Sequence, residues 1–123
     1  MAFNNAQHVV TLEAGANYAT KQFFFVSMSS DGQIDPTGDG AAAIGVLLND
    51  PAAQGRAAEV CIGGLTRVEC GTAGVTAGDD IASDASGNAV PAATGDVILG
   101  TALETGADGE VISIIFQPRN AAA

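Results

Sequence analysis

Carboxylates are the most numerous side chains in this sequence that could do chemistry, and many of them stand beside a glycine. Asp and Glu together number 14, and Asp31-Gly32, Asp39-Gly40 and Asp108-Gly109 show the common arrangement. An Asp next to Gly usually caps or turns the backbone, because its short side chain reaches nearby N–H groups. We interpret these carboxylates as turn residues and predict no catalytic acid and base among them.

Three carboxylates, Asp31, Asp35 and Asp39, follow one another at intervals of four residues around Pro36. Hard cations such as Ca²⁺ take about six to eight oxygen ligands, and EF-hand loops supply them at a spacing of two with a Glu at the end. The Asp31–Asp39 segment lacks that spacing and that Glu. We predict no metal and no cofactor, and calcium in this segment stays an open alternative.

Nucleophiles and bases are scarce. His8 is the only histidine, and the two cysteines, Cys61 and Cys70, flank Gly63-Gly64. A hairpin at the glycine pair would leave the two thiols too far apart for a disulfide, and a continuous strand would point them to opposite faces. We predict two free thiols in either case. Because no nucleotide-binding or zinc-protease motif occurs either, we predict that the protein is not an enzyme.

Charge and hydropathy exclude two classes of partner. The net charge is −10 with only four Lys and Arg residues, so nucleic-acid binding by phosphate neutralisation is not expected. The longest run of large apolar side chains, Phe23–Val26, is far shorter than the ~20 residues of a membrane helix. No secretory signal is visible at the N-terminus. We expect synthesis in a cytoplasm and no contact with a membrane.

Sixteen glycines punctuate short segments rich in Val, Ile, Thr and Phe. This pattern is typical of strands joined by turns and predicts an all-β fold, a small β-barrel or sandwich-like domain of short strands with an extended N-terminal arm. We divide the 123 residues into an arm over 1–12, a single β domain over 13–119 and a flexible tail over 120–123. The predicted strands are His8–Leu12, Gln22–Ser27, Ile44–Leu48, Ala58–Ile62, Leu65–Cys70, Asp80–Ala82, Asn88–Val90, Val97–Leu103 and Glu110–Gln117.

The last two predicted strands, Val97–Leu103 and Glu110–Gln117, are apolar on both faces. Such a strand needs cover on both sides. In a chain this small, the second cover is either another subunit or the loops of a closed barrel, and both alternatives remain open here.

Two turn-rich patterns stand in the second half of the chain. Ala77–Gly87 has the form A-G-D-x-[IL]-x-x-D-x-x-G, and Gly100–Glu104 reads G-x-A-L-E. In these patterns the chain resembles the small capsid cement (head decoration) proteins of tailed bacteriophages, over about Gln22 to Gln117. The matched positions shape turns.

This resemblance implies a structural virion protein that binds the outer face of a phage head as a homotrimer and reinforces the contacts between capsomers. Its partners would be the major capsid protein and copies of itself. We predict that the capsid or trimer interface lies in the arm and in the two-faced strands. The predicted interface residues are Phe3, Asn4, Asn5, His8, Val97, Leu99, Ile112, Ile114 and Phe116.

The alternative is a carbohydrate- or host-surface-binding β module of a virion, such as a head fibre or adhesin, with Ser29–Gly40 as a contact loop. Adhesive loops are usually rich in Tyr and Trp, whose flat rings supply contact area at low entropic cost. The sequence has no Trp, and Tyr18 is its only tyrosine. The composition therefore favours the cement protein.

Overall fold

The computed structural model describes residues 7–121, which form nine strands and no helix. This confirms the prediction of an all-β fold. No helix in this part of the chain is long and apolar enough to span a membrane. The strands are β1 (Gln7–Ala14), β2 (Phe25–Ser30), β3 (Gln33–Pro36), β4 (Gly45–Leu47), β5 (Ala57–Glu69), β6 (Asp80–Ser83), β7 (Ala89–Pro91), β8 (Gly100–Ala102) and β9 (Val111–Phe116).

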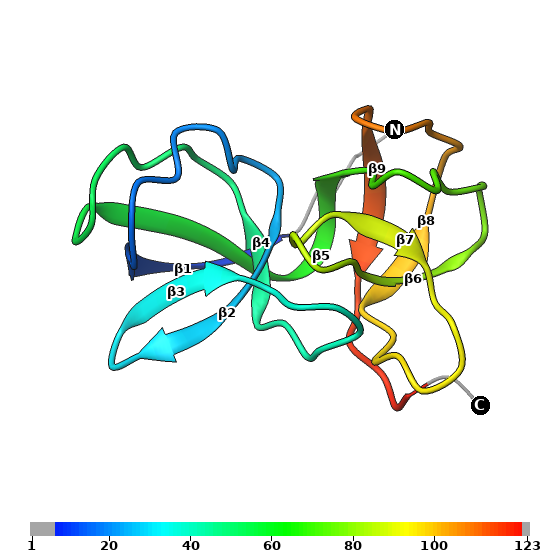
Figure 1. Ribbon diagram of the computed structural model, residues 1–123, viewed down its shortest axis with the longest axis horizontal. Helices are drawn as coiled ribbons and strands as arrows, with labels where there is room; N and C mark the ends of the chain where they lie inside the picture. The colour runs from blue at the N-terminus through cyan, green and yellow to red at the C-terminus, as the bar shows by residue number, and fades with distance from the viewer. Residues whose placement is uncertain (1–6, 122–123) are drawn as a thin grey trace, which may run out of the picture.

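The N-terminal half forms a small closed barrel. Strands β1, β3, β2, β4 and β5 are hydrogen-bonded in that order, and β1 also pairs with β5, which closes the ring (Figure 1). Closure leaves few free strand edges. Its interior is filled by buried side chains from all of these strands and from the loop after β1. They are Ala14, Tyr18, Val26, Ile34, Leu47, Ala58 and Val60.

The C-terminal half wraps a second core. Its strands follow in the order β5, β9, β8, β6 and β7. A parallel bridge from Cys70 to Ala89 brings β7 back beside the end of β5. The buried side chains of this core include Val68, Ile81, Leu99, Ile112, Ile114 and Phe116.

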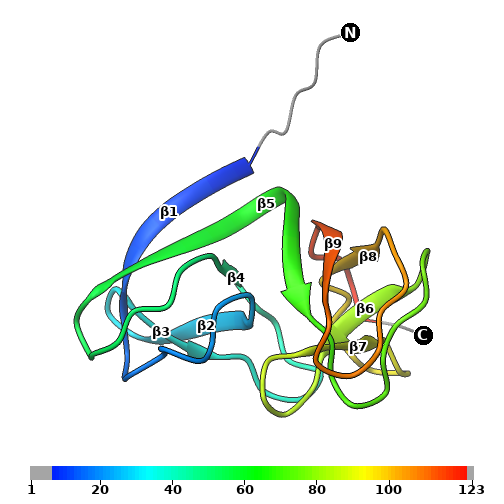
Figure 2. The ribbon, with the colours of Figure 1, turned by 90° about the horizontal axis from the view of Figure 1, so that it is seen from above.

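Strand β5 belongs to both halves. It is a continuous strand of 13 residues that pairs with β1 up to Gly64, with β4 at Val60 and Cys61, and with β9 from Gly64 onward. Gly64 has a φ of 93°, which residues with a side chain rarely adopt. Figure 2 shows that β5 bends sharply along its length. The glycine pair therefore lies within one bent strand. Cys61 and Cys70 are both buried and free, as predicted.

Three segments of the chain pair with neighbouring segments as follows. Residues 7–12 of the predicted arm lie in β1 and pair with β5. The C-terminal segment lies beside residues 97–99: the Arg119 N–H donates to the Ile98 carbonyl, and Ala121 forms a bridge with Val97. Strand β3 falls inside the segment interpreted as a loop, and it forms a hairpin with β2.

Candidate interaction surface

Strand β9 has one buried and one open face. Ile112, Ile114 and Phe116 point into the second core and are almost fully buried. The alternate residues Val111, Ser113 and Ile115 share the opposite face, because successive side chains in a strand alternate. Val111 is 43% exposed and Ile115 is half-buried.

The neighbouring half of β5 continues this open face. In the register of the pair, Leu65 lies opposite Ile115, Arg67 opposite Ser113 and Glu69 opposite Val111. Directly opposed residues of an antiparallel pair share a face. Arg67 is exposed, and Leu65 and Glu69 are half-buried. The face is thus a row of aliphatic side chains with one cation and one carboxylate on its β5 side.

Strand β8 extends the face on the other side of β9. Thr101 lies opposite Ile115, and the N–H of Leu103 donates to the Ser113 carbonyl. Leu103 is 48% exposed. We call the surface formed by Leu65, Leu103, Val111 and Ile115 the outer apolar face.

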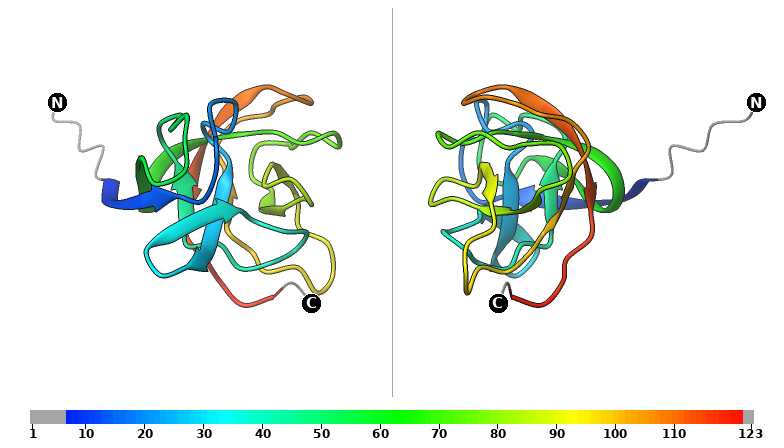
Figure 3. Two further views of the ribbon diagram at one scale, coloured as in Figure 1. Left: turned by 60° about the vertical axis from the view of Figure 1, so that its left-hand side comes forward. Right: turned by 90° about the vertical axis from the view of Figure 1, so that its right-hand side faces the viewer.

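A second pair of exposed apolar side chains lies where β1 meets β5. Val9 pairs with Cys61 beside an irregularity in the register, and Val9 and Ile62 are 43% and 39% exposed. Seen from the end of the molecule, β9 and the β1–β5 ribbon lie along the same side (Figure 3). Strands β1, β5 and β9 and the residue after β8 supply four of the five exposed large apolar residues among those described, namely Val9, Ile62, Val111 and Leu103.

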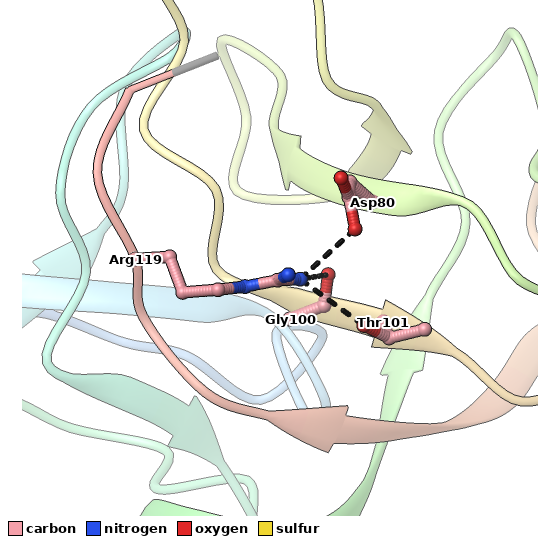
Figure 4. A network of polar contacts seen from close by, with 4 residues as sticks. All are labelled: Asp80, Gly100, Thr101 and Arg119. Atoms are coloured by element: carbon pink, nitrogen blue, oxygen red, sulfur yellow. Dashed lines mark hydrogen bonds and ion pairs between the residues drawn. The ribbon is translucent and has the colours of Figure 1, made fainter.

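Most charges that border the outer apolar face are satisfied within the chain. The Glu104 carboxylate accepts the N–H of Ser113, and the Glu110 carboxylate accepts that of Ala107. On the β8 side, the Arg119 guanidinium pairs with Asp80 at 2.9 Å. The same guanidinium donates to the hydroxyl of Thr101 and the carbonyl of Gly100 (Figure 4).

Arg67 differs from these groups. Its guanidinium forms no ion pair and no side-chain hydrogen bond within residues 7–121. Arginine is enriched in protein interfaces, because its planar group combines apolar contact with directed hydrogen bonds. An exposed, unpaired Arg within an aliphatic row is a typical feature of a contact surface.

Four of the predicted interface residues are in the core, which corrects that expectation. Leu99, Ile112, Ile114 and Phe116 are buried by their own chain, so the second core covers the face on which they lie. This face is covered because Phe25 of β2 and Val46 of β4 pack in the same core.

The remaining predicted interface residues are placed differently. His8 is exposed on β1 and pairs with Gly63. Val97 is half-buried against the second core. Phe3, Asn4 and Asn5 lie outside the described residues.

Sequence reasoning missed the outer apolar face, although one signal was available. In the segment from Leu65 to Glu69, the two charged residues, Arg67 and Glu69, stand at alternate positions and share a face with Leu65. Charges at alternate positions mark the solvent side of a strand. Because Val111 and Ile115 pair with this side, they are on the surface as well.

The Asp31–Asp39 segment contains the turn between β2 and β3 and the whole of β3. The Asp35 carboxylate accepts a hydrogen bond from the hydroxyl of buried Tyr18. Burial, together with the Asp35 carboxylate, raises the pKa of Tyr18 well above its ordinary range. Within residues 7–121, no group of three or more His, Cys, Asp or Glu side chains is arranged to hold a metal ion.

Two surface pockets formed by described residues have no His or Cys in their linings. One, of about 250 Å³, is lined by residues 72–76, Pro91 and residues 106–108. The other, of about 420 Å³, is lined by Thr11, Leu12, Glu13, Gly32, Gly55 and Ala57. Burial raises the pKa of the Cys70 thiol, and the nearby carboxylates, led by Glu110, raise it further. A thiol kept protonated is a poor nucleophile.

A small closed barrel joined to a second β half, with an exposed apolar sheet face, defines an all-β module. The chain matches the family model of the phage cement proteins over residues 4–116 and belongs to that family. This confirms the resemblance seen in the sequence and makes the chain a structural protein of the phage head. No curated protein matches the chain.

Among solved structures, the chain is similar to the N base of the head fibre gp8.5 of bacteriophage phi29. The TM-score is 0.69 at 19% sequence identity, and the match covers 91% of this chain and 95% of the other. At this identity the likeness shows a shared fold.

Proposed function

We propose that the protein binds the outer face of a phage head as a homotrimer and reinforces the contacts between capsomers. The observation that carries the proposal is the match to the phage cement family over nearly the whole chain. The exposed side chains of the outer apolar face support it, because cement proteins act by burying surface in many copies.

The charge of the chain fits an outer position on the shell. With a net charge of −10, a coat of this protein would keep decorated particles apart in solution. The same charge disfavours contact with the packaged DNA. The partners in this proposal are the major capsid protein and further copies of the chain.

We assign the contact with the major capsid protein to the N-terminal residues. Phe3, Asn4 and Asn5 precede β1, and His8 is exposed near its start. Removing residues 1–6 is expected to lower the occupancy of the chain on heads without lowering its melting temperature, because β1 keeps its pairing with β5. Unchanged occupancy would remove these residues from the capsid contact.

The proposal is tested by imaging. Heads that lack the chain are incubated with purified protein and examined by electron cryomicroscopy. The expected result is density of three copies at the junctions between capsomers on the outer surface. Density confined to the tail, or no added density at saturating protein, would contradict the proposal.

The alternative of a carbohydrate-binding module has no exposed tyrosine or tryptophan to support it within the described residues. Tyr18, the only tyrosine, is 6% exposed, and its hydroxyl is bonded to Asp35. The ring is thus part of the first core and is unavailable to a sugar. The Ser29–Gly40 segment contains β3, which is tied to β2 and β1.

A further inference from the structure

We propose that copies of the chain contact each other through the outer apolar face, with Arg67 of one copy facing Glu69 of the next. This inference rests on the proposed homotrimer and names the surface and the ion pair that would form it. A trimer closed by rotation repeats one such contact three times.

The first argument is local charge. A protein with a net charge of −10 repels its own copies, so a contact between copies is favoured where the charge is balanced. On the facing rows of β5 and β9, from Leu65 to Glu69 and from Val111 to Ile115, Arg67 and Glu69 are the only charged residues. These rows are therefore neutral, whereas the surface as a whole has a large excess of carboxylates.

The second argument is complementarity. Arg67 and Glu69 point from the same face of β5 and are two residues apart, about 7 Å along the strand. When this face lies along the three-fold axis, Arg67 of each copy faces Glu69 of the next copy around the ring, so every cation meets a carboxylate. Glu69 accepts a hydrogen bond from Asn88 at 3.3 Å through one oxygen, so the other oxygen is available to an arginine.

The third argument is the apolar surroundings of Arg67 and Glu69. Leu65 and Ile115 lie directly opposite each other beside Arg67, and Val111 lies opposite Glu69. When the faces of neighbouring copies meet around the axis, such side chains pack together and exclude water, which strengthens the ion pair between the copies. The bordering Arg119 is already paired with Asp80 and does not compete for Glu69.

The test is an exchange of charges in the full-length chain, measured by sedimentation velocity and equilibrium. Arg67→Glu and Glu69→Arg are each expected to raise the dissociation constant of the trimer at least about tenfold, because like charges then meet. The double variant, with both changes, is expected to restore the parent value. Arg56→Glu makes the same charge change at an exposed position outside the face and is the matched control.

Folding is checked separately for each variant. Glu69→Gln keeps an oxygen for Asn88 and removes only the charge, so it separates loss of the ion pair from loss of the Asn88 bond. Each variant should keep the thermal unfolding transition of a folded β domain.

Three results would overturn the inference: a monomeric parent chain, single variants that sediment like the parent, or a double variant as weak as the single ones. Occupancy on heads is measured on the same proteins. If the single variants stay trimeric and still decorate heads, the proposed contact is wrong while the cement function stands. If the charge exchange behaves as expected but no variant and no parent chain binds heads, the proposed function fails instead.

Discussion

The rings of Phe25 and Phe116 meet in the second core, with their centroids 6.2 Å apart and their planes at 40°. Phe25 comes from β2 in the N-terminal barrel, and Phe116 ends β9 in the C-terminal half. The pair therefore ties the two halves into one packed unit. Tilted aromatic pairs at this distance add to the stabilisation from buried area.

Removing one of these rings is expected to destabilise the whole chain. Phe116→Ala should lower the free energy of unfolding by about 3–5 kcal/mol, because a large buried ring is replaced by a cavity. Ile115→Ala, on the outer face of the same strand, should cost much less. Chemical denaturation at concentrations where the chain is monomeric measures both. Equal losses would mean that both faces of β9 are covered in the single chain.

Which face of β9 is buried could not be predicted from the sequence. The apolar character of both faces of Glu110–Gln117 was visible, and so was the need for cover on both sides. Period-2 alternation assigns residues to two faces but does not say which face is inward when both are aliphatic. Ile112 is inward because Phe25 and Val46, distant in sequence, pack in the same core.

The strand pattern was mostly predictable, since Gly and Asp mark the turns between Val- and Ile-rich segments. Two elements were not. Gln33–Pro36 has one large apolar residue, Ile34, and forms a strand because Ile34 fits the first core between β1 and β2. The Gly63-Gly64 pair is a common hairpin signal, yet here β5 continues through it to pair with β9.

Two glycines allow a matched test of the pairing of β8 with β9. A Cβ at Gly100 would lie 2.1 Å from the carbonyl oxygen of Ile115, whereas a Cβ at Gly63 would meet nothing within 4 Å. We expect Gly100→Ala to lower the free energy of unfolding by about 1–3 kcal/mol or more, because the two strands must move apart. Gly63→Ala should change it by less than about 1 kcal/mol.

Thermal unfolding monitored by circular dichroism compares the two glycine variants. Similar melting temperatures for both would contradict the close approach of β8 and β9.

The Arg119 side chain is expected to hold the C-terminal segment on β8. Arg119→Met removes the ion pair to Asp80 and the bond to Thr101. Both partners of the ion pair are partly exposed, so the loss of global stability should be no more than about 1 kcal/mol. Local opening should increase more, and hydrogen exchange of the Gln117 and Arg119 amides, which bond to residues 98 and 99, measures it.

Arg56→Met, at an exposed position elsewhere, is the control for this local effect. Amide exchange at Gln117 that is equally fast in the two variants would show that the Asp80 pair does not hold the segment.

Two raised pKa values predict lower stability in alkali. Burial raises the pKa of Cys70 above its ordinary value of 9.0, and burial with Asp35 raises that of Tyr18. The folded chain therefore keeps protons that the unfolded chain releases, and the linked stability is lost as the pH rises. We expect the free energy of unfolding to be constant up to about pH 8 and to fall above about pH 9.

Urea denaturation between neutral and alkaline pH tests this dependence. Cys70→Ala should make the fall shallower from about pH 9, and Tyr18→Phe should do so above about pH 10. If the free energy of unfolding falls equally with pH in the parent and in both variants, the fall does not come from Cys70 and Tyr18.

The central claim is reinforcement of the phage head, and heat-induced release of DNA measures it most directly. Heads that lack the chain are compared with the same heads after saturation with purified protein, and a DNA-binding dye reports rupture. Decorated heads are expected to release their DNA at a higher temperature than undecorated heads. Release at the same temperature, with full occupancy shown on the same sample, would contradict the account.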